Sequence, residues 1–374
     1  MKKNSIGILG GGQLCQMLAE YLISNGNEVY FIDPSPNPPA KHTKAIHIQD
    51  DYDDLSALEK LIDNCNVITY EFENIPLKSL EFLEKKINIY PSKKILSVAQ
   101  NRLNEKNNFI KCGIKTPKFF SFNKRDDLKN KLKKENIETP IIIKTNTLGY
   151  DGKGQFHIEK KEEISSILEL LDDGTDYIVE QKIKFKKEFS VIIGRNYNGE
   201  IFHFDPFENI HKNGILDISI SPARIDQNTI NDATELAKKF VTKNNLIGII
   251  AIEMFLDNNN SILFNEIAPR PHNSGHLTIE SHSLSQFGML GKILNNERIE
   301  KPVIKKSSIM KNILGEFFIN KDHKKILEKI SITPNHFVKM YNKDEPKIGR
   351  KMGHVTIFTE NIERSIVKIN KLID

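Results

Sequence analysis

Two glutamates in one strand–turn–strand segment, Glu253 and Glu266, could together hold a divalent cation. They lie in GIIAIEMFLDNNNSILFNEIAPRP, where two apolar runs flank the polar turn DNNN, a pattern that predicts an antiparallel hairpin. If Leu256 pairs with Ser261, Glu253 lies opposite Phe264, and Glu266 is its diagonal neighbour on the same face. Carboxylates this close repel each other unless a cation or proton lies between them. Mg²⁺ prefers such oxygen ligands and adds phosphate oxygens; a one-residue bulge would undo this arrangement.

Lys144 and a glycine loop could bind the phosphates of a nucleotide. Lys144 ends the apolar run 141–144, and GYDGKGQ follows with a second lysine, Lys153. The chain contains no G-x-x-x-x-G-K-[ST] motif, but a lysine on a strand and a glycine loop can clamp phosphates without one. Together with the hairpin, these residues predict a magnesium–nucleotide site.

A second glycine loop, GGGQLC, lies near the amino terminus. It only partly matches G-x-G-x-x-G, because Cys15 stands where the third glycine would be. Asp33 follows at about the distance expected of a ribose-binding acid. These residues leave three interpretations open: an ordinary turn of the sheet, a substrate phosphate site, or a dinucleotide site.

The elements that must position these residues form an α/β pattern. In the first hundred residues, apolar runs at 6–9, 29–33, 67–70 and 87–90 alternate with helical patterns at 14–22, 55–62 and 77–85. This alternation predicts a doubly wound parallel sheet that binds ligands at the carboxyl ends of its strands. A helix at 98–111 leads to a smaller α/β block and then to strand-rich segments. The tail after residue 302 predicts a small β-rich unit.

The composition limits the class of protein. The chain has 374 residues, 39% of them hydrophobic and 28% charged, enough for two or three domains. The lysine-rich segments are interrupted by acids at helical spacing, so a net charge of +5 indicates solvated helix faces and no nucleic-acid partner. No apolar run is long enough to span a membrane. Three scattered cysteines predict free thiols in the cytoplasm and no structural zinc.

A series of motifs along nearly the whole chain resembles the ATP-grasp superfamily, and within it the 5-(carboxyamino)imidazole ribonucleotide synthase family of purine biosynthesis. The motifs are GGGQL, YEFENIP, QNRLNEK, GYDGKGQ, VEQKIKFKKEFSV, ENIHKNGIL, NEIAPRPHNSGH and RKMGH. The resemblance implies an ATP-grasp fold in three parts. These are a Rossmann-like pre-ATP-grasp domain at 1–105, an ATP-grasp domain at 106–298 with a lid at about 115–180, and a small β-rich carboxy-terminal domain at 299–374.

The resemblance also implies roles for particular residues. Those for ATP are Arg102, Lys144, Gly149, Tyr150, Asp151, Gly152, Lys153, Gly154, Gln155, Glu180, Gln181, Lys182, Ile183, Glu188, His211, Asn265 and Glu266. Those for the ribonucleotide are Gly11, Gly12, Gln13, Leu14, Glu73, Tyr150, Asp151, Arg270, His272, Asn273, Ser274, Arg350 and Lys351. Glu253 and Glu266 would hold magnesium, and Arg270, Asp151, Lys144 and Lys153 would be catalytic. The chain departs from the family pattern at Cys15 and at the TNTLG that follows Lys144.

The implied activity is an ATP-dependent ligase reaction that joins carbon to nitrogen. Bicarbonate would take the γ-phosphate of ATP to give carboxyphosphate, which carboxylates the exocyclic amine of 5-aminoimidazole ribonucleotide. ATP, two Mg²⁺ ions and bicarbonate are the expected cofactors and co-substrates. The protein is expected to be a cytoplasmic homodimer.

Three other functions remain open at this point. A different ATP-grasp ligase, such as a formate-dependent glycinamide ribonucleotide transformylase or a biotin carboxylase, would use the same hairpin with another acceptor. A nicotinamide-dependent oxidoreductase would use the first glycine loop but leaves the hairpin unexplained. A nucleotide-binding subunit without turnover would not need the intact set of Lys144, Glu253, Glu266 and Arg270. The HNSGH segment contains two histidines four apart, but its Pro and Gly neighbours argue against a helical zinc site.

Overall fold

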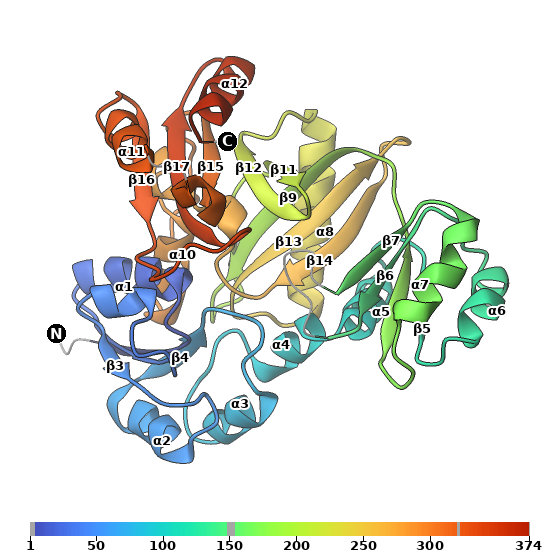
Figure 1. Ribbon diagram of the computed structural model, residues 1–374. Coiled ribbons are helices and arrows are strands. Elements are labelled where there is room, and N and C mark those ends of the chain that lie inside the picture. Colours follow the sequence, from blue (N-terminus) through green and yellow to red (C-terminus); the bar gives the residue numbers. More distant parts are fainter. Residues whose placement is uncertain (1–3, 148–153, 320–321, 374) are drawn as a thin grey trace.

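Three β-sheets and the helices around them make up the computed structural model, which describes residues 4–147, 154–319 and 322–373. In Figure 1 the amino-terminal unit lies at one side in blue and a small green unit lies at the opposite side. A long twisted central sheet runs between them, and the orange and red carboxy-terminal segment extends it.

The amino-terminal unit is a parallel sheet in the order β3-β2-β1-β4, with helices on both faces. Its elements are β1 (Ser5–Leu9), α1 (Gln13–Ser24), β2 (Glu28–Ile32), η1 (Pro39–His42), β3 (Ile46–Ile48), α2 (Leu55–Asn64), β4 (Val67–Tyr70) and α3 (Leu77–Glu84). The predicted doubly wound sheet is confirmed. The run 87–90, predicted as a strand, contributes only an isolated bridge between Ile89 and Ile68. Pro91 follows at once and has no N–H with which to extend the pairing.

The predicted helix 98–111 is two helices, α4 (Lys93–Ala99) and α5 (Arg102–Lys111). Asn101 adopts an extended backbone between them, and its side chain accepts the N–H of Asn104, which makes it the N-cap of α5. Asn146 binds the same helix start, since its carbonyl and side-chain oxygen accept the N–H groups of Arg102 and Leu103 (both 2.9 Å). The break therefore fixes Arg102 at the first helical position, beside the end of a strand from the green unit.

The green unit is a four-stranded antiparallel sheet in the order β5-β8-β6-β7. Its elements are β5 (Phe119–Phe122), α6 (Asp127–Lys134), β6 (Ile141–Thr145), β7 (Gln155–Ile158), η2 (Lys161–Glu163), α7 (Ile164–Leu170) and β8 (Tyr177–Gln181). Both α6 and α7 bury apolar side chains against one face of this sheet, where Leu128 and Ile164 meet Ile143 and Val179. Lys144 and Glu180 alternate with these apolar residues along β6 and β8 and therefore lie on the other face.

The central sheet has the strand order β14-β13-β9-β11-β12-β15-β17-β16, with β10 paired to β9. Its elements up to residue 294 are β9 (Phe185–Arg195), β10 (Ile201–His203), β11 (Phe207–Lys212), β12 (Ile215–Ser221), α8 (Gln227–Lys243), β13 (Gly248–Asp257), β14 (Ile262–Ala268), η3 (Asn273–Gly275), α9 (Thr278–Ser281) and α10 (Gln286–Leu294). Helix α8 covers one face, where Ala237 and Phe240 pack against Ile193 and Ile250. Alternate residues of β9 and β13 therefore point to the opposite face.

The carboxy-terminal segment continues the same sheet, because β15 pairs with β12. Its elements are β15 (Ser308–Leu314), η4 (Gly315–Ile319), α11 (His323–Ser331), β16 (His336–Met340), β17 (Lys351–Phe358) and α12 (Ile362–Ile373). The tail was predicted as a β-rich unit, but it also contains two helices. Helices α11 and α12 pack apolar residues such as Ile330 and Ile369 on the strands. Among the helices of the described residues, none combines the length and apolar character needed to cross a bilayer.

Candidate active site

The hairpin of β13 and β14 does not have the expected register. Leu256 pairs with Ile262 and not with Ser261. On an unbroken antiparallel ladder this register would place Glu253 and Glu266 on opposite faces of the sheet. The expected pairing was wrong by one residue, because the turn residues alone do not determine where pairing begins.

A one-residue bulge at Asn265 corrects that offset, so the two glutamates pair directly across the hairpin. In the expected register a bulge would have separated the two glutamates, but in the observed register, which is offset by one residue, it brings them to the same face. Helix α5 binds the backbone at the bulge and two residues beyond it. The Lys106 ammonium donates to the Asn265 carbonyl (2.7 Å), and the Ile267 N–H donates to the Glu105 carboxylate (2.7 Å). Both ionisable side chains are buried, and neither residue was among the predicted site residues.

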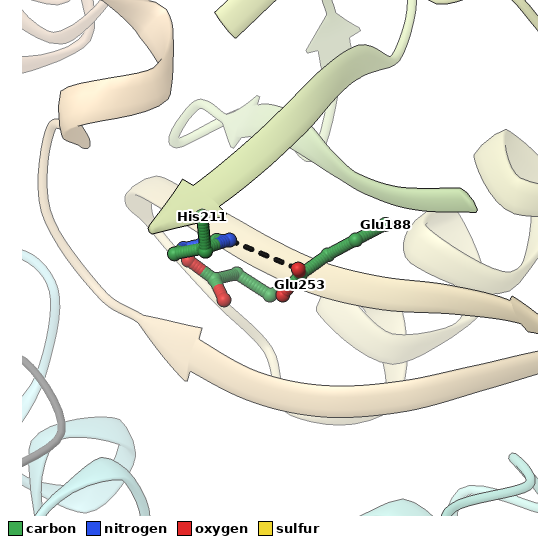
Figure 2. Close-up of side chains that lie close together, drawn as sticks. All are labelled: Glu188, His211 and Glu253. Carbon is green, nitrogen blue, oxygen red and sulfur yellow. Dashed lines mark hydrogen bonds and ion pairs between the residues drawn. The ribbon is translucent and has the colours of Figure 1, made fainter. Parts of the chain in front are cut away.

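Glu253 meets two side chains from neighbouring strands, Glu188 of β9 and His211 of β11 (Figure 2). One ligand atom from each residue lies within 4.8 Å of the other two, and His211 Nδ1 is 2.9 Å from Glu188 Oε2. Burial alone would lower the pKa of His211, but the hydrogen bond and charge of Glu188, with the charges of Glu253 and Glu266, raise it to about 9. Two carboxylates and an imidazole in this arrangement can bind a divalent cation or the polar groups of a nucleotide.

The two hairpin glutamates have different further partners. Glu253 Oε1 lies 3.2 Å from His272 Nε2, whereas Glu266 Oε2 lies 3.2 Å from Arg102 Nη1. Burial opposes ionisation of Glu253, yet His272 and the charges of His211 and Lys351 lower its pKa to about 2. The Glu253 carboxylate is thus ionised at neutral pH, as a metal ligand must be.

A buried charge cluster joins the green unit to the hairpin. Glu180 Oε2, at the end of β8, lies 3.2 Å from Lys144 Nζ and 3.3 Å from Lys106 Nζ. Burial would raise the pKa of Glu180, but the charges of Lys106, Lys144 and Arg102 lower it to about 2. The second oxygen of Glu180 is buried and accepts no hydrogen bond from the described residues. A ligand donor such as an exocyclic amine would satisfy it.

The other residues predicted to bind ATP lie around this cluster or outside the residues that the structure describes. Gln181 donates to the carbonyls of Glu138 and Pro140 (2.7 and 2.9 Å), and Lys182 pairs with Glu159. Ile183 is partly exposed just beyond β8, and Gly154 and Gln155 lie at the start of β7. Gly149, Tyr150, Asp151, Gly152 and Lys153 lie outside the described residues.

The amino-terminal glycine loop binds a carboxylate of the protein itself. Glu71 Oε1 accepts the N–H of Gly12 (2.7 Å), and Oε2 accepts those of Leu14 and Cys15 (both 3.2 Å). The loop is glycine-rich for this reason, since a Cβ on Gly12 would lie only 2.4 Å from Glu71 Oε1. Glu73 of the same YEFEN segment was a predicted site residue, whereas Glu71 was not.

Asp33 completes this arrangement and argues against a dinucleotide site. Its carboxylate accepts the Gly11 N–H (2.8 Å), the Ser35 N–H (2.9 Å) and the Tyr52 hydroxyl (2.9 Å). The N–H groups that would bind a pyrophosphate at a helix N-terminus therefore donate to protein carboxylates. Gln13, the first residue of α1, remains partly exposed.

Replacing Glu71 with Gln should destabilise the amino-terminal unit by about 2 kcal/mol, because the amide has one acceptor oxygen and turns its NH₂ group toward N–H donors. Thermal unfolding measures this as a lower Tm. The control is Glu81→Gln, an exposed glutamate of α3 paired with Lys93 at 3.4 Å, which should leave the Tm unchanged. Equal Tm values for the two variants would contradict the assigned role of Glu71.

Some predicted substrate residues gather where the amino-terminal unit meets the hairpin. Arg270 Nη2 lies 2.5 Å from Glu73 Oε1, and the charge of Lys351 acts on Glu253. Arg350 donates to the Glu345 carbonyl (2.8 Å). Glu73, Arg270, Arg350 and Lys351 are all partly buried.

The HNSGH residues divide between surface and core. His272 is partly exposed, and the side chains of Asn273 and Asn312 exchange two hydrogen bonds (3.0 and 2.6 Å). Ser274 is fully buried and bonds to His272 and Ser190, so its side chain cannot contact a substrate in this structure.

Three buried histidines near this segment should make the protein sensitive to acid. Burial lowers the pKa of His354 to about 3, that of His282 to about 4 and that of His276 well below its usual range. A histidine whose pKa falls on folding stabilises the fold fully above its unfolded pKa of about 6.5, and this stability is lost as the pH decreases.

The Tm deficit of His354→Asn relative to the wild type should therefore shrink between pH 6.5 and 4.5, because only the wild type loses the contribution of this group. Differential scanning calorimetry measures both proteins across that range. His336→Asn is the control at a partly exposed site. A deficit that stays constant with pH would contradict the expectation.

Three family models match successive parts of the chain. A ribonucleotide synthetase preATP-grasp domain matches residues 1–100, an ATP-grasp domain matches residues 107–287, and a phosphoribosylaminoimidazole carboxylase C-terminal domain matches residues 308–367.

Relatives and solved structures cover nearly the full length. The chain is 36% identical over 362 residues to the N5-carboxyaminoimidazole ribonucleotide synthase of Staphylococcus aureus strain MRSA252, a match that covers 96% of this chain and 94% of that protein. The crystal structure of the Staphylococcus aureus N5-carboxyaminoimidazole synthetase with ADP gives a TM-score of 0.92 at 35% identity, over 100% of this chain and 98% of that one. The crystal structure of the Aspergillus clavatus synthase in complex with ADP and 5-aminoimidazole ribonucleotide gives a TM-score of 0.90 at 31% identity. This match covers 100% of this chain and 98% of that one.

Proposed function

Because this chain belongs to the N5-carboxyaminoimidazole ribonucleotide synthase family of ATP-grasp enzymes, we propose that it carboxylates 5-aminoimidazole ribonucleotide with ATP and bicarbonate. It is an ATP-dependent ligase of purine biosynthesis that forms a carbon–nitrogen bond. The products are N5-carboxyaminoimidazole ribonucleotide, ADP and phosphate.

The observation that carries this function is the bulge at Asn265. It pairs Glu253 with Glu266 across the hairpin and lies beside the buried cluster of Lys106, Lys144 and Glu180. Anionic groups for a metal and cationic groups for phosphates are thus next to each other. This combination suits a magnesium–nucleotide complex.

The donor set at the hairpin fits Mg²⁺. The Glu253 carboxylate is ionised, and Glu266 presents a second carboxylate whose side chain is 42% exposed. We propose that these two glutamates hold two magnesium ions together with phosphate oxygens. When bound, magnesium neutralises charge on the phosphoryl group that is transferred.

The cationic side chains would position ATP. We assign Lys144, Arg102 and His211 to its phosphates, and Glu188 to the ribose hydroxyls. The adenine would lie against residues 180–183, where the unsatisfied oxygen of Glu180 can accept its amino group. Residues 149–155 would cover the phosphates, with Lys153 as a further cation.

The acceptor would bind between the amino-terminal unit and the hairpin. We assign Glu73, Arg270, His272 and Asn273 to this site, together with Arg350 and Lys351 and, from the loops, Gln13, Tyr150 and Asp151. The solved relative with ADP and 5-aminoimidazole ribonucleotide supports a site of this kind. Gly11, Gly12 and Leu14 would support it through the backbone, since their N–H groups donate to Asp33 and Glu71.

The reaction would proceed in two steps. A bicarbonate oxygen attacks the γ-phosphorus of ATP, the bond to ADP breaks, and carboxyphosphate forms. Carboxyphosphate releases phosphate and carbon dioxide inside the closed site, the exocyclic amine attacks the carbon, and its proton leaves to give the carbamate. Lys144, Lys153 and Arg270 would offset the negative charge, Asp151 would contact the amine, and the closed lid would exclude water.

The test is phosphate release from ATP with and without 5-aminoimidazole ribonucleotide and bicarbonate. Stimulation that needs both compounds supports the assignment. Stimulation by glycinamide ribonucleotide with formate would assign the chain to a different ATP-grasp reaction. No stimulation by any acceptor would overturn the proposed activity.

We also propose that the protein works as a homodimer in the cytoplasm, where ATP and purine precursors are available. Light scattering during size-exclusion chromatography measures the oligomeric state, and the mass of a monomer would contradict the proposed homodimer. The boundaries 1–105, 106–298 and 299–374 remain our proposal for the domains.

A further inference from the structure

A row of buried polar side chains crosses the central sheet beside Glu253. Ser190 lies directly opposite Glu253 in the β13–β9 pairing, and Asn209 lies directly opposite Ser219 in the β11–β12 pairing. Ser190 and Ser219 are fully buried, and Asn209 is 4% exposed. Burying such groups among apolar strands is costly unless each is hydrogen-bonded.

These side chains form one continuous hydrogen-bond chain that ends at the proposed metal site. Ser219 Oγ donates to Asn209 Oδ1 (3.1 Å), and Asn209 Nδ2 donates to Ser190 Oγ (3.1 Å). Ser190 Oγ is 2.7 Å from Ser274 Oγ. From Ser274 the chain continues through His272, whose Nδ1 is 2.8 Å from Ser274 Oγ and whose Nε2 is 3.2 Å from Glu253 Oε1.

The donors in this chain all point toward Glu253. The amide nitrogen of Asn209 can only donate, so the Ser190 hydroxyl accepts that bond. We assign Ser190 as the donor to Ser274, because its hydroxyl proton has no other acceptor among the hydrogen bonds of the described residues. The backbone N–H of Ser274 also points at Nδ1 of His272 (3.3 Å). Because an N–H and a hydroxyl both face Nδ1, this nitrogen is an acceptor, and the ring proton lies on Nε2, assigned from the network. His272 therefore donates to the Glu253 carboxylate.

The backbone of His272 is held as firmly as its ring. The side-chain oxygen of Gln286 accepts the His272 N–H (2.8 Å), and its NH₂ group donates to the His272 carbonyl (2.8 Å). Gln286 is fully buried, and Gly275 leaves room for it, since a Cβ there would lie 2.7 Å from the Gln286 oxygen.

We propose that Ser274 and Ser190 are positioning residues that hold His272 as an Nε2–H donor to Glu253, which fixes the orientation of that carboxylate for a divalent cation. This inference depends on the proposed function only because that function identifies the cation as Mg²⁺. Partners that orient metal ligands in this way typically change metal affinity or activity by about 10- to 100-fold when they are removed.

The first test is Ser274→Ala, with Ser281→Ala as a matched control. Ser281 is also fully buried and bonds to a histidine (His282 Nδ1, 2.8 Å), but it lies outside the chain. Imidazole ¹⁵N shifts should show the Nε2–H tautomer of His272 in the wild type and in Ser281→Ala, and a tautomer mixture in Ser274→Ala. The Mg²⁺ concentration for half-maximal ADP formation should rise about tenfold in Ser274→Ala alone.

Ser190→Ala keeps the Ser274 hydroxyl, and it provides a second test of the inference if Ser274→Ala does not fold. It should shift the tautomer and the magnesium dependence in the same direction by a smaller factor. An unchanged tautomer in both chain variants, or a magnesium dependence equal to that of Ser281→Ala, would overturn the inference. A wild type without ADP formation would instead overturn the proposed function, while the tautomer would still test the positioning role.

Discussion

Glu266→Gln is expected to reduce ADP formation by about 10³-fold, because it removes one of the two carboxylates that would hold magnesium against the transferred phosphate. The fold should survive, since the amide oxygen can still accept the hydrogen bond from Arg102 that Glu266 Oε2 accepts now at 3.2 Å. The measurement is steady-state ADP production with saturating 5-aminoimidazole ribonucleotide and bicarbonate, together with the Tm.

A matched control makes this result specific. Glu235→Gln makes the same change on α8, at an exposed glutamate that pairs with Lys238 at 2.8 Å, and it should leave the rate unchanged. A folded Glu266→Gln protein with near-normal turnover would remove Glu266 from the metal site. In that case Glu188, His211 and Glu253, whose ligand atoms already lie within 4.8 Å of one another, would remain as the cation site.

Lys106→Met is expected to destabilise the protein by about 3 kcal/mol, because a buried charge cluster loses one partner while the others stay in place. Lys106 is 1% exposed, donates to the Asn265 carbonyl at 2.7 Å and lies 3.3 Å from Glu180. Its loss leaves the bulge carbonyl without a donor, so the hairpin should also shift and weaken ATP binding. Thermal unfolding and the KM for ATP measure the two effects.

The double variant Lys106→Met with Glu180→Gln tests whether the two groups act as a pair. It should lose less stability than the sum of the single variants, because the Lys106–Glu180 interaction that each single variant removes can be lost only once. Lys239→Met is the control, since this exposed lysine also donates to a backbone carbonyl, that of Gly113 (3.0 Å). If Lys106→Met is as stable as Lys239→Met, Lys106 does not hold the bulge.

Much of the fold could be predicted from local pattern. The alternation of apolar runs and helical patterns gave the parallel sheet, and the polar turn DNNN gave the hairpin, because both depend on residues close in sequence. The break at Asn101 was missed, although an asparagine that caps a helix is a local signal. Helices α11 and α12 were missed in a tail interpreted from its strands alone.

The candidate site was predictable in its residue types but not in its geometry. Glu253 and Glu266 could be selected from one segment, yet the reason they face each other lies in Glu105 and Lys106, more than 140 positions earlier in the chain. A buried Glu–Lys pair in a helix has the same sequence pattern as a solvated one. Only the packed structure distinguishes them, since α5 lies against the bulge and supplies the backbone partners it lacks.

By itself, the sequence determined which chemistry this protein can perform, because carboxylates, lysines and glycine loops are properties of single residues and short segments. Tertiary structure alone decided which groups meet. In the folded chain, N–H groups of the first glycine loop donate to the Glu71 carboxylate, and the two hairpin glutamates lie on one face of the sheet. The physical reason is that a backbone N–H donates to, and a carbonyl accepts from, whichever partner packing brings within reach, and packing depends on contacts between distant parts of the chain.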